Sequence, residues 1–127
     1  MKVSAKQLEA VLALTGARRF EHFVKVVVDW EQAWGLYQEG WALAAAEDGL
    51  PVFPLWPAKE YAQLCAVAEW DGHEPSPIAL DKLLDELLPM LTRDGVLVGV
   101  FFTPSGKGTP VSADELRQAL AVELQNY

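Results

Sequence analysis

The sequence is poor in the residue types that most often carry chemistry. It contains one cysteine and two histidines, so it cannot form an internal disulfide and nothing in it requires an oxidising compartment. Neither His22 nor His73 has cysteine or histidine partners at the spacing of zinc ligands. The sequence therefore predicts no metal site, no cofactor and no catalytic residue.

Long apolar runs and basic clusters are also lacking. No segment approaches the ~18 consecutive apolar residues of a membrane-spanning helix, and Lys6 and Glu9 interrupt any signal-peptide core. Lysine and arginine total 10 against 18 acidic residues, a formal net charge of −8. Because binding to phosphates needs a basic surface, this balance excludes nucleic acid as a partner. We predict a cytoplasmic protein without a membrane partner.

What the chain does contain is typical of one globular domain. Hydrophobic residues make up 51% of its 127 positions and charged residues 22%, which are not the values of a disordered chain. A chain of this size buries roughly two-thirds of its unfolded surface. We predict a single α+β domain over residues 1–127, with the N-terminal helix in residues 1–16.

The most informative stretch is residues 33–57, which hold three of the five tryptophans. Alternating aromatic and aliphatic residues between glycine-containing turns indicate short antiparallel strands. Gly40 and Gly49 are expected to adopt the positive φ that tight reversals require. The predicted strands of this meander cover residues 34–37, 41–46 and 51–55.

The rest of the chain predicts helices and one central strand. The apolar run over residues 96–102 indicates a strand covered on both faces, with Val98, Val100 and Phe102 in the core and Leu97 and Phe101 on the other face. Residues 109–111 form an edge strand, since they contain a proline. Helices are expected over residues 4–14, 17–29, 58–68 and 81–88, and from Ser112 onward, with Gly16 ending the first, Asp81 capping the fourth, a kink or restart at Leu88, and a loop over residues 70–77.

These elements define the predicted fold class. It is α+β, with an antiparallel or mixed sheet of four to six strands and helices mainly on one face. Aspartate at Val100 should unfold such a domain, because an unpaired charge would be buried.

Candidate binding residues come from the tryptophans and the loop around His73. Each tryptophan is interpreted first as a core residue, but tryptophan is also enriched at binding sites. Cys65 falls on an apolar helix stripe, which favours a buried structural thiol. If a pocket exists, we expect it between the strand meander and the helix after Trp56, lined by Trp41, Trp56, Lys59, Tyr61, Trp70 and His73.

Several motifs carry a family resemblance. They are Trp34–Tyr37, Gly40–Trp41, Phe53–Pro57, and Asp94–Gly95 followed by the apolar strand. Over about residues 18–122 the chain resembles a bacterial family catalogued as domain of unknown function 2750. More distantly, its later two-thirds resembles the N-terminal domain of the enhanced serine sensitivity protein B type. Both resemblances imply a small bacterial cytosolic α+β domain, and neither assigns catalytic residues.

Two classes of function stay open. The first is a non-enzymatic protein-interaction or regulatory module, such as an immunity-like protein that binds a basic partner; it rests on the acidic charge and the absence of a convergent catalytic set. The alternative is a small-ligand-binding protein or enzyme with a tryptophan-lined pocket next to Trp56. A homodimer is compatible with either, formed through an exposed edge at residues 109–111 or 34–37.

Overall fold

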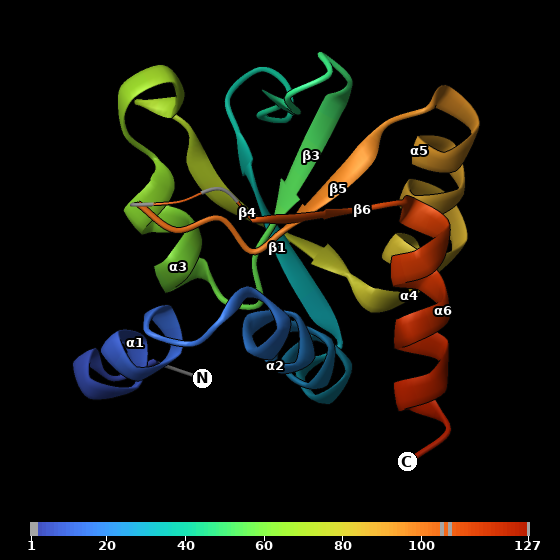
Figure 1. The fold of residues 1–127 in the computed structure, drawn as a ribbon, viewed down its shortest axis with the longest axis horizontal. Helices are drawn as coiled ribbons and strands as arrows, with labels where there is room; N and C mark the ends of the chain where they lie inside the picture. The colour runs from blue at the N-terminus through green and yellow to red at the C-terminus, as the bar shows by residue number, and fades with distance from the viewer. Residues whose placement is uncertain (1–2, 105, 107, 127) are drawn as a thin grey trace.

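The computed structural model describes residues 3–104, 106 and 108–126, and these form an α+β domain with mixed strand pairing, as predicted (Figure 1). In this view α1 and α2 lie below the strands, α3 lies to the left, and α5 and α6 lie to the right. Among these residues no helix has the length and apolar character needed to span a bilayer. The elements are α1 (Ala5–Leu12), α2 (Gly16–Trp30), β1 (Gln32–Tyr37), β2 (Ala44–Ala45), β3 (Pro51–Leu55), α3 (Lys59–Cys65), the 3₁₀ turn η1 (Ala68–Trp70), β4 (Glu74–Ala79), α4 (Leu80–Lys82), the π-helical turn η2 (Leu83–Leu87), α5 (Leu88–Asp94), β5 (Leu97–Val100), β6 (Thr109–Val111) and α6 (Ala113–Leu124).

Hydroxyl side chains begin three of the helices. Ser4, Thr15 and Ser112 each accept a hydrogen bond from the backbone N–H three residues later, at 3.1, 3.2 and 3.0 Å. Such caps satisfy amides that have no partner inside the helix. The prediction that Gly16 ends the first helix is wrong, because Thr15 caps a new helix and Gly16 becomes its first residue.

Strand β1 pairs with β4, which replaces the loop expected over residues 70–77. The two strands are antiparallel, with Trp34 opposite Pro77 and Leu36 opposite Pro75. The prolines were interpreted as loop residues, but β4 is paired on one side only, and an edge strand tolerates residues without an N–H. On its other side β1 joins β3, since Trp34 and Trp56 exchange two backbone hydrogen bonds of 2.8 Å.

The second sheet has the order β2-β3-β5-β6, with β3 and β5 parallel and the outer pairs antiparallel. The expected meander is wrong in its middle strand, because β2 contains only Ala44–Ala45. The turn before it differs from the prediction as well. Glu39 has the positive φ of 57°, whereas Gly40 does not; Gly49 does, with φ 85°.

Strand β5 lies at the centre of this sheet, as predicted. Val98 and Val100 are buried on the face that α2 and α6 cover. The assignment of Phe101 and Phe102 was wrong, because Phe101 takes a φ of 111° that ends the strand and turns its ring into the core. Phe102 then lies half-buried on the opposite face, which no helix covers completely.

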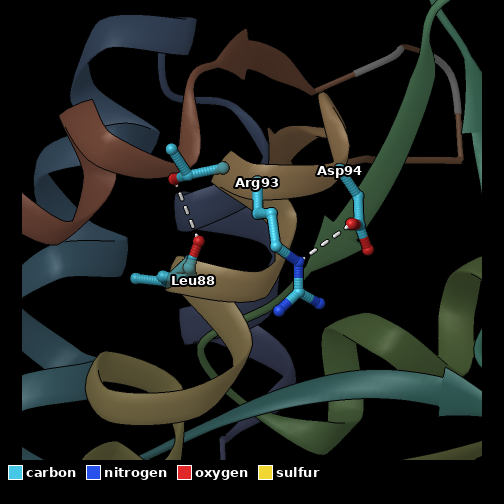
Figure 2. Close-up of polar contacts among 4 residues, drawn as sticks. Leu88, Arg93 and Asp94 are labelled. Carbon is cyan, nitrogen blue, oxygen red and sulfur yellow. Dashed lines mark hydrogen bonds and ion pairs between the residues drawn. The ribbon is translucent and has the colours of Figure 1, made fainter.

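The helical segment after β4 restarts at Leu88, as Pro89 predicted. The turn Leu83–Leu87 is π-helical, and the N–H of Leu88 donates to the carbonyl of Leu83. Helix α4 begins at Leu80 instead of being capped by Asp81. Figure 2 shows the turn that follows, where the Thr92 hydroxyl donates to the Leu88 carbonyl at 3.0 Å and Arg93 pairs with Asp94 at 3.3 Å. The π-helical turn Leu83–Leu87 is wider than an α-helical turn, and such a turn accommodates Pro89, which lacks an N–H.

Candidate functional site

An apolar hollow of about 530 Å³ opens on the uncovered face of the second sheet, and we call it the Trp70 hollow. Its walls come from β2, from the segment around η1 and from the chain that follows β5. A second hollow of about 480 Å³ adjoins it and shares Ala45 and Phe102. The residues lining the Trp70 hollow are Ala44, Ala45, Cys65, Val67, Ala68, Glu69, Trp70, Phe102, Thr103, Pro104 and Gly106.

Three aromatic rings support the inner wall of the hollow. Trp56 lies edge-on to Trp70 with ring centroids 6.0 Å apart, and Phe102 lies 5.5 Å from Trp70 and 6.5 Å from Trp56. The indole N–H of Trp56 donates to the Phe102 carbonyl at 2.9 Å. Edge-to-face aromatic contacts and a satisfied indole N–H are the favourable arrangements for these rings. The fully buried Trp56 therefore fixes Trp70 and Phe102 from behind.

Two residues with unfavourable backbone conformations border this hollow. Phe101 has a φ of 111° and Ala68 a φ of 52°, both in the positive region that side chains other than glycine rarely adopt. Such residues cost about 1–3 kcal/mol each and cluster at functional sites. Gly99 completes the arrangement, because a Cβ there would lie 2.3 Å from the Phe102 ring. The turn at Phe101 thus leaves the Phe102 ring over Gly99, beside the hollow.

Cys65 lines the hollow as an inert thiol. Its side chain is buried, and its Sγ donates to the Phe102 carbonyl at 3.5 Å. Burial raises the pKa of the Cys65 thiol to about 11, although a hydrogen bond with Trp56 acts in the opposite direction. Only the thiolate is nucleophilic, so at neutral pH this cysteine is a packing residue.

The structure brings three of the six predicted site residues to the hollow or next to it. Trp70 lines the hollow and Trp56 supports it, and His73 is adjacent, with its Nδ1 3.2 Å from the Trp70 carbonyl oxygen. Trp41 lies elsewhere, with ring centroids 5.1 Å from Tyr37 and 5.6 Å from Phe53. Lys59 lines a separate pocket with Trp30 and Trp34, and Tyr61 packs on Phe101 in the core, 4.9 Å between ring centroids.

Sequence reasoning missed Val67 and Phe102 as lining residues. Val67 was placed within a helix that ends earlier, at Cys65. Phe102 was assigned to the core by simple strand alternation, and the φ reversal at Phe101 leaves no sequence signal such as a glycine.

Comparison with known proteins decides the family. A family model described as "Protein of unknown function (DUF2750)" matches residues 20–120. The chain belongs to the DUF2750 family. No curated protein and no solved structure matches it. The more distant resemblance to the enhanced serine sensitivity protein B type is not shown by these comparisons.

The acidic residues of this DUF2750 protein are unevenly distributed. Residues 26–81 contain ten of the 18 acids and Lys59 as their single base. Glu69 lines the Trp70 hollow, and Glu47 and Asp48 line the adjoining one. The described lining residues of the two hollows carry these three acids and no lysine or arginine. Within the same described ranges no cluster of three or more His, Cys, Asp or Glu residues could hold a metal ion.

Tyr61 offers a test of the core of this DUF2750 domain. Its buried hydroxyl has no hydrogen-bond partner among the described residues. Burial, and then the nearby charge of Glu60, raises the pKa of Tyr61 from 10.0 to about 12. Folding thus favours the neutral form of the Tyr61 side chain. The free energy of unfolding therefore falls as the pH rises above 10.0, the pKa of tyrosine in the unfolded chain.

We therefore expect Tyr61→Phe to fold with unchanged or slightly raised stability at neutral pH, because burying an unpaired hydroxyl costs about 1–3 kcal/mol. Between about pH 10 and pH 12 the wild type should lose more free energy of unfolding than the variant. Urea denaturation at a series of pH values measures both effects. A variant that is much less stable at neutral pH would show that the hydroxyl has a partner.

Proposed function

We propose that this protein is a non-catalytic interaction module that binds an extended apolar segment of a partner protein, flanked by basic residues, in the Trp70 hollow. The observation that carries the proposal is the combination of an apolar floor with an acidic rim. The floor is formed by alanines, Trp70 and Phe102, and the rim by Glu69 with Glu47 and Asp48 of the adjoining hollow.

Exposed apolar side chains extend the floor outward. Val67 lines the hollow and is 56% exposed. Leu43, 50% exposed, lies next to it, because its carbonyl accepts a hydrogen bond from the Trp70 indole at 3.4 Å. Contiguous exposed apolar surface with a polar rim marks interaction sites in soluble proteins. Its desolvation by a partner supplies affinity.

Charge complementarity selects the kind of partner. The acids around the two hollows attract lysine or arginine residues that flank an apolar segment, and they repel an acidic one. A basic partner is therefore favoured in both encounter rate and specificity.

A catalytic role has less support. Among the described residues the Cys65 thiol donates to the Phe102 carbonyl and not to a side-chain base, and the raised pKa keeps that thiol protonated. Nucleophilic catalysis requires a nucleophile within hydrogen-bond reach of a base. No such pair lies among the described residues that line the hollow.

The proposal is tested with a fluorescein-labelled peptide whose apolar centre is flanked by lysines. We expect it to bind the wild type, measured by fluorescence polarisation, and to bind more weakly as salt rises. Val67→Asp should weaken binding by at least about tenfold, equivalent to ~1.4 kcal/mol, because it places a charge on the apolar floor. Glu69→Lys should weaken it by reversing a rim charge.

Val122→Asp is the matched control for the floor, since Val122 is 61% exposed on α6 and lines neither hollow. The same peptide with glutamates in place of lysines controls for charge. Equal binding of both peptides, or equal loss in the Val67 and Val122 variants, would contradict the proposal.

A small apolar ligand is the second candidate, and the volume of the hollow favours it. Its 530 Å³ falls in the range of roughly 300–1,000 Å³ typical of small-molecule pockets. The peptide experiment separates the two, because a hollow that accepts only a small apolar ligand would bind neither the lysine-flanked nor the glutamate-flanked peptide.

Self-association through sheet edges has less support than either. The expected exposed edge at residues 34–37 does not exist, since β1 is bonded to β4 on one side and to Trp56 and Ala42 on the other. β6 is an edge strand as predicted, but it contains Pro110, and β4 contains Pro75 and Pro77. Prolines on edge strands hinder pairing with another chain.

A further inference from the structure

A second pocket lies away from the Trp70 hollow and shares no lining residue with it. It has a volume of about 230 Å³ and is bounded by the end of α2, by β1 and by the turn from β3 into α3. We call it the Trp30 pocket. It is lined by Trp30, Gln32, Trp34, Pro57, Ala58, Lys59 and Glu60.

A left-handed residue separates the two segments that carry these tryptophans. Glu31 follows Trp30 directly and has a φ of 57°, so α2 ends in a left-handed residue that is not glycine. Gln32 and Trp34 alternate along β1 and therefore face the same side of the strand. Trp30 stays 46% exposed at the pocket. A large exposed indole beside a strained residue is typical of binding sites.

The pocket is lined by one residue of each charge. Lys59 and Glu60 both line it, and neither forms an ion pair with another described residue. The Glu60 carboxylate accepts one backbone hydrogen bond from Val3 at 3.5 Å, the limit of such a contact. One ammonium and one carboxylate therefore line the pocket together with two tryptophans.

We propose that the Trp30 pocket binds a free α-amino acid with an apolar side chain. The ligand carboxylate pairs with Lys59, its ammonium pairs with Glu60, and its side chain packs against the indoles of Trp30 and Trp34. A ligand with a single charge would pair with either Lys59 or Glu60 and would leave the other residue without a partner in the ligand. A zwitterion whose ammonium and carboxylate are both bonded to one carbon satisfies both.

Calorimetric titration with L-leucine, N-acetyl-L-leucine and isopentylamine tests this site. The acetylated compound lacks the ammonium and the amine lacks the carboxylate. We expect L-leucine to bind the wild type at least about tenfold more tightly than either analogue. Lys59→Gln and Glu60→Gln should each weaken L-leucine by a similar factor, and Trp30→Ala should abolish the signal.

Lys25→Gln is the control, because Lys25 is an exposed lysine of α2 that does not line the pocket. Absence of L-leucine binding at millimolar concentration would overturn the inference. Equal binding of L-leucine and N-acetyl-L-leucine would overturn it too, since the ammonium would then not be recognised. Neither result affects the peptide site, whose variants lie in other residues.

Discussion

Replacing Val100 with aspartate is expected to abolish cooperative folding. Val100 is 1% exposed in the middle of the second sheet, where it pairs with Leu55 on one side and Thr109 on the other. The described core contains no buried charged residue that would pair with the carboxylate. Burying an unpaired charge costs several kcal/mol, which is comparable with the total stability of about 5–15 kcal/mol of a domain.

Circular dichroism during thermal denaturation measures this result, with Val122→Asp as the matched control. Val122 is 61% exposed on α6, so its replacement should change stability by no more than about 0.5 kcal/mol. A soluble Val100→Asp variant with a cooperative transition would show that β5 is not the centre of the sheet.

Replacing Trp56 with alanine is expected to cost about 3–5 kcal/mol of stability. The indole is fully buried, packs on Trp70 and Phe102, and donates to the Phe102 carbonyl at 2.9 Å. Its removal leaves a cavity directly behind the Trp70 hollow and removes one hydrogen bond from the strained turn. Urea denaturation should report the loss, and the melting temperature should fall by roughly 10–25 °C.

Trp56→Phe separates packing from hydrogen bonding, because it retains an aromatic ring and removes the N–H donor. We expect it to lie between the wild type and the alanine variant in stability. A Trp56→Ala variant as stable as the wild type would show that this ring does not support the hollow. The expected loss also means that Trp56 is unsuitable for testing binding, which is why the peptide experiment uses the exposed Val67 instead.

The two proposed sites differ in how directly the sequence indicated them. The sequence placed Trp56 and Trp70 in one candidate pocket, and the structure brings their rings to 6.0 Å. It also grouped Trp41, Lys59 and Tyr61 with them, but these side chains face three other places. Residues that follow Trp56 closely in sequence need not line the same pocket, because the backbone turns between β3 and α3 and neighbouring side chains then lie on different faces.

Local patterns determined much of this protein. The hydroxyl caps at Ser4 and Ser112, the strand over Pro51–Leu55, the restart at Leu88 and the central place of β5 all follow from interactions among residues near in sequence, or from a long apolar run. Hydrogen bonds of caps and the effect of proline act within one turn of chain. These features can therefore be predicted from the sequence without knowledge of the tertiary structure.

Tertiary contacts decided the rest. Glu74–Ala79 became a strand because β1 offers it a partner, and its prolines are tolerated because its outer side is unpaired. Phe101 accepts a positive φ because its ring is buried against Tyr61, and this one reversal turns Phe102 from core residue to wall of the Trp70 hollow. These conformations are stabilised by packing between segments far apart in sequence. The sequence alone therefore indicated the family and the fold class of this chain, whereas the contacts between distant segments determined its hollows.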